Sequence, residues 1–177
     1  MYETPDEIDE LDRLIERSFA HAGSHLTSII RPQRRLSAAD LVAYLVGVRH
    51  LAVATVTAGG EPRTSGADGL FLHAKWWFTS SASSLKAHHL ERRPACSVTH
   101  LRGDDIGIFA HGTVRVLHGV TPETDAMAPI WRGIFESVPE DWTERPEDAR
   151  YFELTATAMF GYAHSRKRFD ALVSGSA

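Results

Sequence analysis

The chain has 177 residues, of which 43% are hydrophobic and 24% are charged, a size and composition typical of one globular domain. Its formal net charge of −4 and its pI of about 6.2 give no electrostatic reason to expect nucleic acid or an anionic membrane as a partner. The single cysteine, Cys96, excludes an internal disulfide and a cysteine-rich zinc site. Cys96 lies in a largely apolar run, so we expect a small buried side chain.

The N-terminal sequence gives no sign of export or membrane insertion. Residues 1–7 are acidic and contain no apolar segment, which argues against a secretory signal peptide. No apolar run approaches the roughly 18 residues that a membrane-spanning helix needs. We therefore expect a cytoplasmic protein without membrane association, whose partner is a small-molecule substrate.

Residues 1–48 predict a helical extension with two helix starts. Thr4 and Glu7 have the spacing of a capping box, and the apolar residues that follow recur at helical spacing. A second start lies at Ser37, with Asp40 at the third helical position. The two predicted apolar faces consist of Ile8, Leu11, Ile15 and Phe19 in the first helix, and of Leu41, Leu45 and Val48 in the second.

Residues 49–165 predict a barrel domain. Runs rich in β-branched and aromatic residues, separated by turn residues, indicate strands at 51–57, 62–73, 75–79, 95–101, 106–118 and 150–163. A short helix over 84–92 interrupts the series, and an amphipathic helix that opens at Thr121 precedes the last strand. We predict a mainly β fold, a six-stranded antiparallel split barrel, because closure removes exposed strand edges. Residues 166–177 are expected to form a basic, solvated tail.

The segment from Phe78 to Lys86 leaves a predicted strand and enters a predicted helix. It contains five hydroxyl residues within six positions and a lysine in the first helical turn. A helix N-terminus offers unpaired N–H groups and about half a positive charge, which favour an anion. A plainer interpretation is that Ser83 or Ser84 caps the helix and that Lys86 is solvated.

The order of short motifs along residues 45–117 resembles the pyridoxamine 5′-phosphate oxidase-like, FMN-binding split-barrel superfamily. The matching motifs are the Gly59-Gly60 hairpin, Pro62–Gly66, Trp77–Ser81, Lys86, Leu90, Arg93-Pro94 and His111–Val114. The resemblance implies a homodimer of two barrels that binds two cofactors at its interface.

The resemblance also implies the residues that hold the cofactor. The phosphate end would contact Thr79, Ser80, Ser81, Ser84 and Lys86, with His89 in support. The flavin ring would lie beside the backbone of Arg63, Thr64, Ser65 and Gly66. Gly66 stands where many relatives carry proline, and Ser84 stands where many carry arginine, so the ring contact and the phosphate affinity differ from the usual pattern.

The expected function is that of an oxidoreductase that moves hydride between the cofactor and a small organic substrate. The cofactor ring carries the reactivity in such enzymes, so no catalytic residue is named. FMN is the first candidate, the deazaflavin coenzyme F-420 the second, and haem is the least favoured. The longer deazaflavin tail would need a basic groove, for which the candidates are Arg92, Arg93, Arg166, Lys167 and Arg168. The alternatives are a non-catalytic flavin- or haem-binding protein and an interaction module without a ligand.

Ten histidines and a tryptophan pair complete the candidates. The histidines do not form a group of three or four with the spacing typical of metal sites, so we expect no metal. Trp76 and Trp77 are neighbours in a predicted strand and must face opposite sides. One is expected in the core, and the other at the helix cover or the subunit interface. Arg150, Tyr162 and Arg166 are candidates to reach a partner's cofactor.

Overall fold

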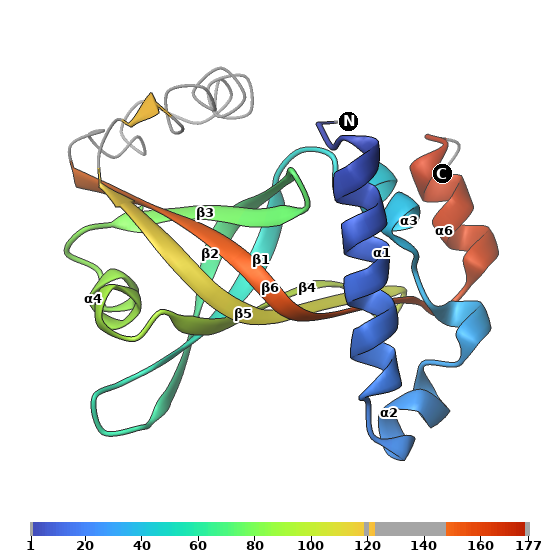
Figure 1. The fold of residues 1–177 in the computed structure, drawn as a ribbon, viewed down its shortest axis with the longest axis horizontal. Helices are drawn as coiled ribbons and strands as arrows, with labels where there is room; N and C mark the ends of the chain where they lie inside the picture. Colours follow the sequence, from blue (N-terminus) through green and yellow to red (C-terminus); the bar gives the residue numbers. More distant parts are fainter. Residues whose placement is uncertain (1, 119–120, 123–147, 176–177) are drawn as a thin grey trace.

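The six strands form one closed antiparallel barrel in a computed structural model, which describes residues 2–118, 121–122 and 148–175 (Figure 1). The strands are β1 (Arg49–Val56), β2 (Pro62–Leu72), β3 (Lys75–Ser81), β4 (Ala95–Arg102), β5 (Ile106–His118) and β6 (Ala149–Ala163). They follow one another around the barrel as β1-β2-β3-β6-β5-β4. The predicted six-stranded antiparallel barrel is confirmed. The amphipathic helix predicted before the last strand lies outside the described residues.

Helices occupy the two ends of the barrel (Figure 1). They are α1 (Pro5–Ala20), α2 (Ser24–Ile29), the 3-10 turn η1 (Pro32–Arg34), α3 (Ala38–Tyr44), α4 (Leu85–Arg92) and α6 (Arg166–Val173). In Figure 1, α1, α3 and α6 gather at one end of the long axis, and α4 lies at the other. Both predicted capping boxes are present, Thr4 with Glu7 and Ser37 with Asp40.

Helix α1 and the segment before α3 cover the part of β6 that β3 does not reach. Strand β3 pairs with β6 only over Ala149–Leu154, so the far half of β6 has backbone groups without a ladder partner on that side. The N–H of Met159 donates to Ser18 Oγ at 2.9 Å, and the N–H of Leu36 donates to the carbonyl of Gly161 at 3.0 Å. The N-terminal extension therefore completes the hydrogen bonding of the barrel as well as its core.

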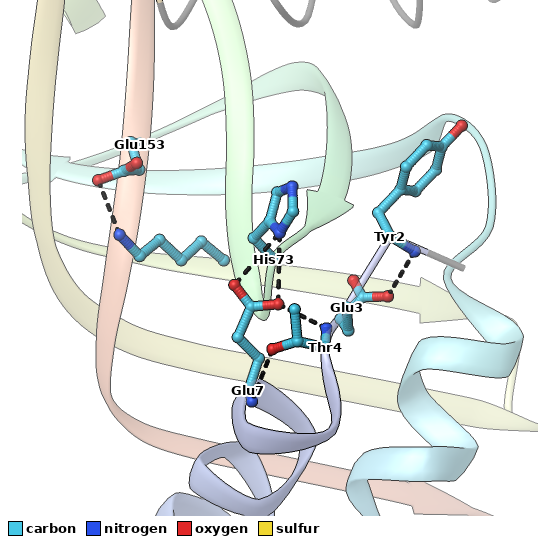
Figure 2. Close-up of polar contacts among 7 residues, drawn as sticks. Tyr2, Glu3, Thr4, Glu7, His73 and Glu153 are labelled. Atoms are coloured by element: carbon cyan, nitrogen blue, oxygen red, sulfur yellow. Dashed lines mark hydrogen bonds and ion pairs between the residues drawn. The ribbon is translucent and has the colours of Figure 1, made fainter.

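The turn between β2 and β3 is tied to the start of α1. His73 and Ala74 both adopt positive φ (53° and 58°), as expected for the tight two-residue turn between paired strands. His73 Nδ1 lies 3.2 Å from Glu7 Oε1, and Glu7 also accepts from the N–H of Thr4 at 2.7 Å (Figure 2). One carboxylate thus both caps α1 and fixes α1 to the barrel.

The tryptophan pair faces two different apolar clusters, as predicted. Trp76 lies in the main core inside the barrel, with Phe71 and Phe78. Trp77 lies in a smaller cluster with Leu70, Leu72 and Leu117. Next to Trp77, the buried carboxylate of Glu153 contacts Lys75 Nζ at 3.2 Å (Figure 2) and Arg115 at 3.1 Å.

The segment expected as a solvated tail begins with a helix instead. The basic side chains of Arg166, Lys167 and Arg168 are exposed, but Phe169 is only 2% exposed and packs against Tyr44. Burial of this one aromatic side chain explains why α6 folds onto the barrel.

Candidate cofactor-binding site

The hydroxyl-rich turn connects β3 to α4 and is organised by its own hydrogen bonds. Ser84 is the N-cap of α4, and its Oγ accepts from the N–H of Ala87 at 3.1 Å. Ser80 Oγ and Ser84 Oγ are 2.8 Å apart, and Ser81 Oγ and Ser83 Oγ are 2.9 Å apart. Thr79 precedes them on β3, opposite Tyr151 of β6. The turn therefore gathers four hydroxyl groups at the N-terminus of an eight-residue helix.

Lys86 joins this turn to β2. Its Nζ donates to the carbonyl of Gly66 at 2.6 Å, across 20 positions of sequence. The plainer interpretation of the turn therefore accounts for Ser84 as a cap and leaves this contact of Lys86 unexplained. The two groups of predicted cofactor ligands, one on the turn and one on β2, meet at this hydrogen bond.

The first half of β2, which contains the residues predicted to lie beside the flavin ring, is exposed to solvent. Arg63, Thr64, Ser65 and Gly66 are all exposed, although they pair with β1, whereas Gly69–Leu72 are buried. A barrel strand normally buries one of its two faces. This stretch thus offers backbone and side chains to a ligand or to another chain. The guanidinium of Arg63 contacts Glu61 at 2.7 Å and does not reach the serine turn.

One face of α4 is fixed to β1 by basic side chains. Lys86, His89 and Arg93 follow at helical spacing. His89 Nδ1 is 2.9 Å from Thr55 Oγ1, and Arg93 Nε donates to the carbonyl of Val56 at 2.9 Å. From the sequence, His89 was expected to support the phosphate site, and Arg93 was named in the Arg93-Pro94 motif and as a candidate for a cofactor tail. The spacing i, i+3, i+7 from Lys86 through His89 to Arg93 could have shown from the sequence that the three side chains share one face of the helix.

The charges around the turn favour an anion. The first turn of α4 contributes the positive end of the helix dipole, and Lys86 in that turn contributes a full charge. Arg150 lies opposite Ser80 on β6, and its Nε contacts Glu91 of α4 at 3.0 Å. Arg150 was named from the sequence as a candidate to reach a partner's cofactor. In the structure it lies near the serine turn of its own chain.

An open groove of about 470 Å³ lies beside the contact between α4 and β1. Its lining comes from the ends of β1 and β4 and from β5, and includes Thr55, Ser97 and His111. His111 Nδ1 is 2.7 Å from Ser97 Oγ. The groove therefore shares Thr55 with the hydrogen bond that holds His89.

Nucleophilic and metal chemistry find little support among the described residues. Cys96 is buried, as predicted, and burial raises the pKa of its thiol to about 12, so it stays protonated at neutral pH. Within residues 2–118, 121–122 and 148–175, no three His, Cys, Asp or Glu side chains converge on a possible metal position. None of the helices described is long and apolar enough to cross a membrane.

A family model described as pyridoxamine 5′-phosphate oxidase matches residues 38–162, well over half of the chain. The chain belongs to the pyridoxamine 5′-phosphate oxidase family. The resemblance stated from the sequence is therefore confirmed, and the matched range contains all the residues predicted to hold the phosphate end and the flavin ring. No curated protein matches the chain in sequence.

Solved structures share the fold at low sequence identity. A conserved hypothetical protein of Mycobacterium tuberculosis has 20% identity and a TM-score of 0.61, covering 78% of this chain and 91% of its own. A FAD-binding protein of Mesorhizobium loti has 16% identity and a TM-score of 0.60, covering 75% and 98%. An F420 reductase has 17% identity and a TM-score of 0.54, covering 66% and 93%. Proteins with this fold thus include a FAD-binding protein, an F420 reductase and, in Mycobacterium smegmatis, a haem-binding protein.

Proposed function

We propose that this protein is an oxidoreductase that binds FMN between the N-terminus of α4 and the exposed half of β2. The observation that carries the proposal is the 2.6 Å hydrogen bond from Lys86 Nζ to the carbonyl of Gly66. It joins an anion-binding turn to an exposed strand, which are the two surfaces that a phosphate-bearing ring system needs.

The residues present fit such a cofactor chemically. The hydroxyls of Ser80, Ser81 and Ser84 and the ammonium of Lys86 are donors suited to a phosphate. The backbone of Thr64–Gly66 is open to a flat ring, and a Cβ at Gly66 would meet nothing within 4 Å, so nothing crowds this side of the strand. When bound, the flavin would supply the hydride chemistry. The chain would hold the phosphate, orient the ring against β2 and exclude water from it.

The placement of the arginines favours FMN over the deazaflavin coenzyme F-420. A long anionic tail needs a continuous basic groove, but the five candidate residues are divided between α4 and α6, at opposite ends of the molecule (Figure 1). On α6, Arg166 contacts Asp40 at 2.7 Å, and Arg168 contacts Asp105 at 3.0 Å. These two charges are already compensated, and Arg92 and Arg93 lie at the C-terminal end of α4, away from the serine turn.

The proposed unit is a homodimer with a cofactor at each interface site. The supporting observations are the strand Arg63–Gly66, exposed beyond what a barrel strand normally shows, and the open groove over β1, β4 and β5. A second copy that covers both would also shield the flavin ring from water.

Comparison of three ligands, each with a nicotinamide reductant, tests the proposal. Purified protein is titrated with FMN, coenzyme F-420 and haem, and each complex is then assayed for hydride transfer with NADH or NADPH. We expect FMN to bind most tightly and to be reduced or reoxidised with turnover. A protein that binds flavin or haem without turnover would support the alternative of a carrier. A protein that binds none of the three would refute both.

A further inference from the structure

Four basic side chains cluster where β1 and β4 separate, at the end of the barrel away from α4. The ladder between β1 and β4 covers only Ala52–Ala54 and Ser97–Thr99, so the strands diverge beyond it. The ring of His100 fills the gap: its Nδ1 donates to the carbonyl of His50 at 3.1 Å. Its Nε2 is 3.1 Å from the hydroxyl of Tyr44. Because a carbonyl only accepts, the first contact places a proton on Nδ1, whereas the Tyr44 hydroxyl can either donate to Nε2 or accept from it.

A cavity of about 270 Å³ opens at this place. The described residues that line it are Tyr44, Val48, Arg49, His50, His100, Leu101 and Arg102, of which four are basic and none is acidic. Arg49 lies over the ring of Tyr44 and donates to the carbonyls of Tyr44 and Val48. Its Nε is buried and has no hydrogen-bond partner within the described part of the chain.

The positive charge of this cluster is not balanced by the described residues around it. The one carboxylate that forms an ion pair with it there is Asp68, which contacts the exposed His50 at 2.8 Å. Burial lowers the pKa of His100, and the neighbouring Arg49, His50 and Arg102 lower it further. Burial likewise lowers the pKa of Arg49, and Arg102 adds to this effect. Gathering like charges costs free energy, which a bound anion would offset.

We propose that this cavity binds the carboxylate or phosphate group of a small molecule, at a site separate from the cofactor site. Guanidinium groups are suited to both oxyanions through paired donors, and Arg49 and Arg102 both line the cavity. Val48 and Leu101 offer apolar surface to the carbon part of the ligand. The cavity and the contact of α4 with Thr55 are roughly 20 Å apart along β1, at about 3.3 Å per residue.

NMR of the histidine rings in the full chain tests this proposal. The protein is titrated at constant ionic strength with inorganic phosphate and, separately, with acetate. We expect saturable shifts of the His100 and His50 signals, assigned with the variants His100→Gln and His50→Gln. If His100→Gln does not fold, the exposed His50 supplies the readout. Saturation by one anion only would identify the ligand class and would support the site.

Three variants localise the binding. Arg102→Gln removes an exposed charge of the cluster, and we expect about tenfold weaker binding, equivalent to about 1.4 kcal/mol. Arg31→Gln, an equally exposed arginine before η1, and Lys86→Ala, in the cofactor site, should leave the affinity unchanged. Absence of saturable shifts with both anions, or unchanged affinity in Arg102→Gln, would overturn the proposal. Neither result depends on whether FMN binds.

Discussion

Single residues in this barrel show how position determines chemistry. Lys86 and Lys75 are both lysines beside a strand, but they have different partners. Lys75 compensates the buried carboxylate of Glu153, so its charge is used inside the fold. Lys86 donates to the backbone carbonyl of Gly66, so it joins the serine turn to β2. Lys75 therefore belongs to a structural ion pair, whereas Lys86 lies at the proposed cofactor site.

His100 predicts a pH dependence of stability. Its pKa in the folded chain lies below the ordinary value of 6.5, with burial as the first cause. The unfolded chain therefore takes up this proton first as the pH falls. The stability is complete above about pH 6.5 and decreases below it, until the folded-state pKa is reached. Urea unfolding from about pH 8 to about pH 5 should show a smaller decrease in His100→Gln than in the wild type. Equal pH profiles would contradict this role of His100.

At the scale of elements, a β-bulge adapts β5 to β6. The register shifts between His111 and Gly112, and Thr157 Oγ1 donates to the carbonyl of His111 at 3.1 Å. A Cβ at Gly112 would lie 2.1 Å from the carbonyl oxygen of Thr155. Glycine is therefore required here by the close approach of two backbones.

Two glycine substitutions test this reading of the bulge. Gly112→Ala should destabilise the protein by about 3 kcal/mol, because backbone atoms must move to admit the methyl group. Gly66→Ala, in open space on β2, should change the free energy of unfolding by less than about 1 kcal/mol. Both are measured by urea unfolding. Similar effects of the two substitutions would show that the close approach at Gly112 is relieved cheaply.

The N-cap of α4 links helix stability to ligand binding. Ser84→Ala removes the acceptor of the Ala87 N–H, and a lost cap costs about 1 kcal/mol. It also removes one hydroxyl from the proposed phosphate site. We therefore expect a lower Tm and weaker FMN binding together, measured by thermal unfolding with and without FMN. Ser37→Ala, at the cap of α3, is the control: it should lower the Tm without changing the FMN affinity.

The sequence predicted most of the helices and strands, but it did not predict the contacts between them. The capping boxes, the strands and the two faces of Trp76 and Trp77 follow from local spacing and alternation. Helix α6 was missed because three basic residues precede its first large apolar one, Phe169, although Ser165 caps the helix and Phe169 packs against Tyr44. The contact of Lys86 with Gly66 depends on how α4 lies against β1, which local patterns do not encode.

In the whole molecule, one end of the barrel is covered by helices and the other end leaves a strand exposed. One end is covered by α1, α3 and α6, which complete the core (Figure 1). At the other end the hairpin between β1 and β2 projects from the barrel on the side of α4, and its strand Arg63–Gly66 remains exposed. An exposed strand beside an anion-binding turn is the part of the molecule that a cofactor and a second copy would cover.

The proposed homodimer predicts a change of mass in a single variant. Ala54 lies on β1 in the open groove, opposite Thr64. Ala54→Arg would place a charge where the second copy is expected, so light scattering should give the mass of a monomer and FMN binding should weaken. Ala20→Arg, at the exposed end of α1, should remain a dimer. A dimer in both variants would place the interface elsewhere.

Thermal unfolding of Lys86→Ala with FMN tests most directly whether FMN lies between α4 and β2. FMN at about 100 times its Kd should stabilise the wild type by about 2.7 kcal/mol, and the control Lys167→Ala, on exposed α6, should behave identically. We predict that Lys86→Ala, at the same FMN concentration, loses most of this stabilisation while unfolding normally without ligand. Equal stabilisation of Lys86→Ala and the wild type by FMN would contradict the site.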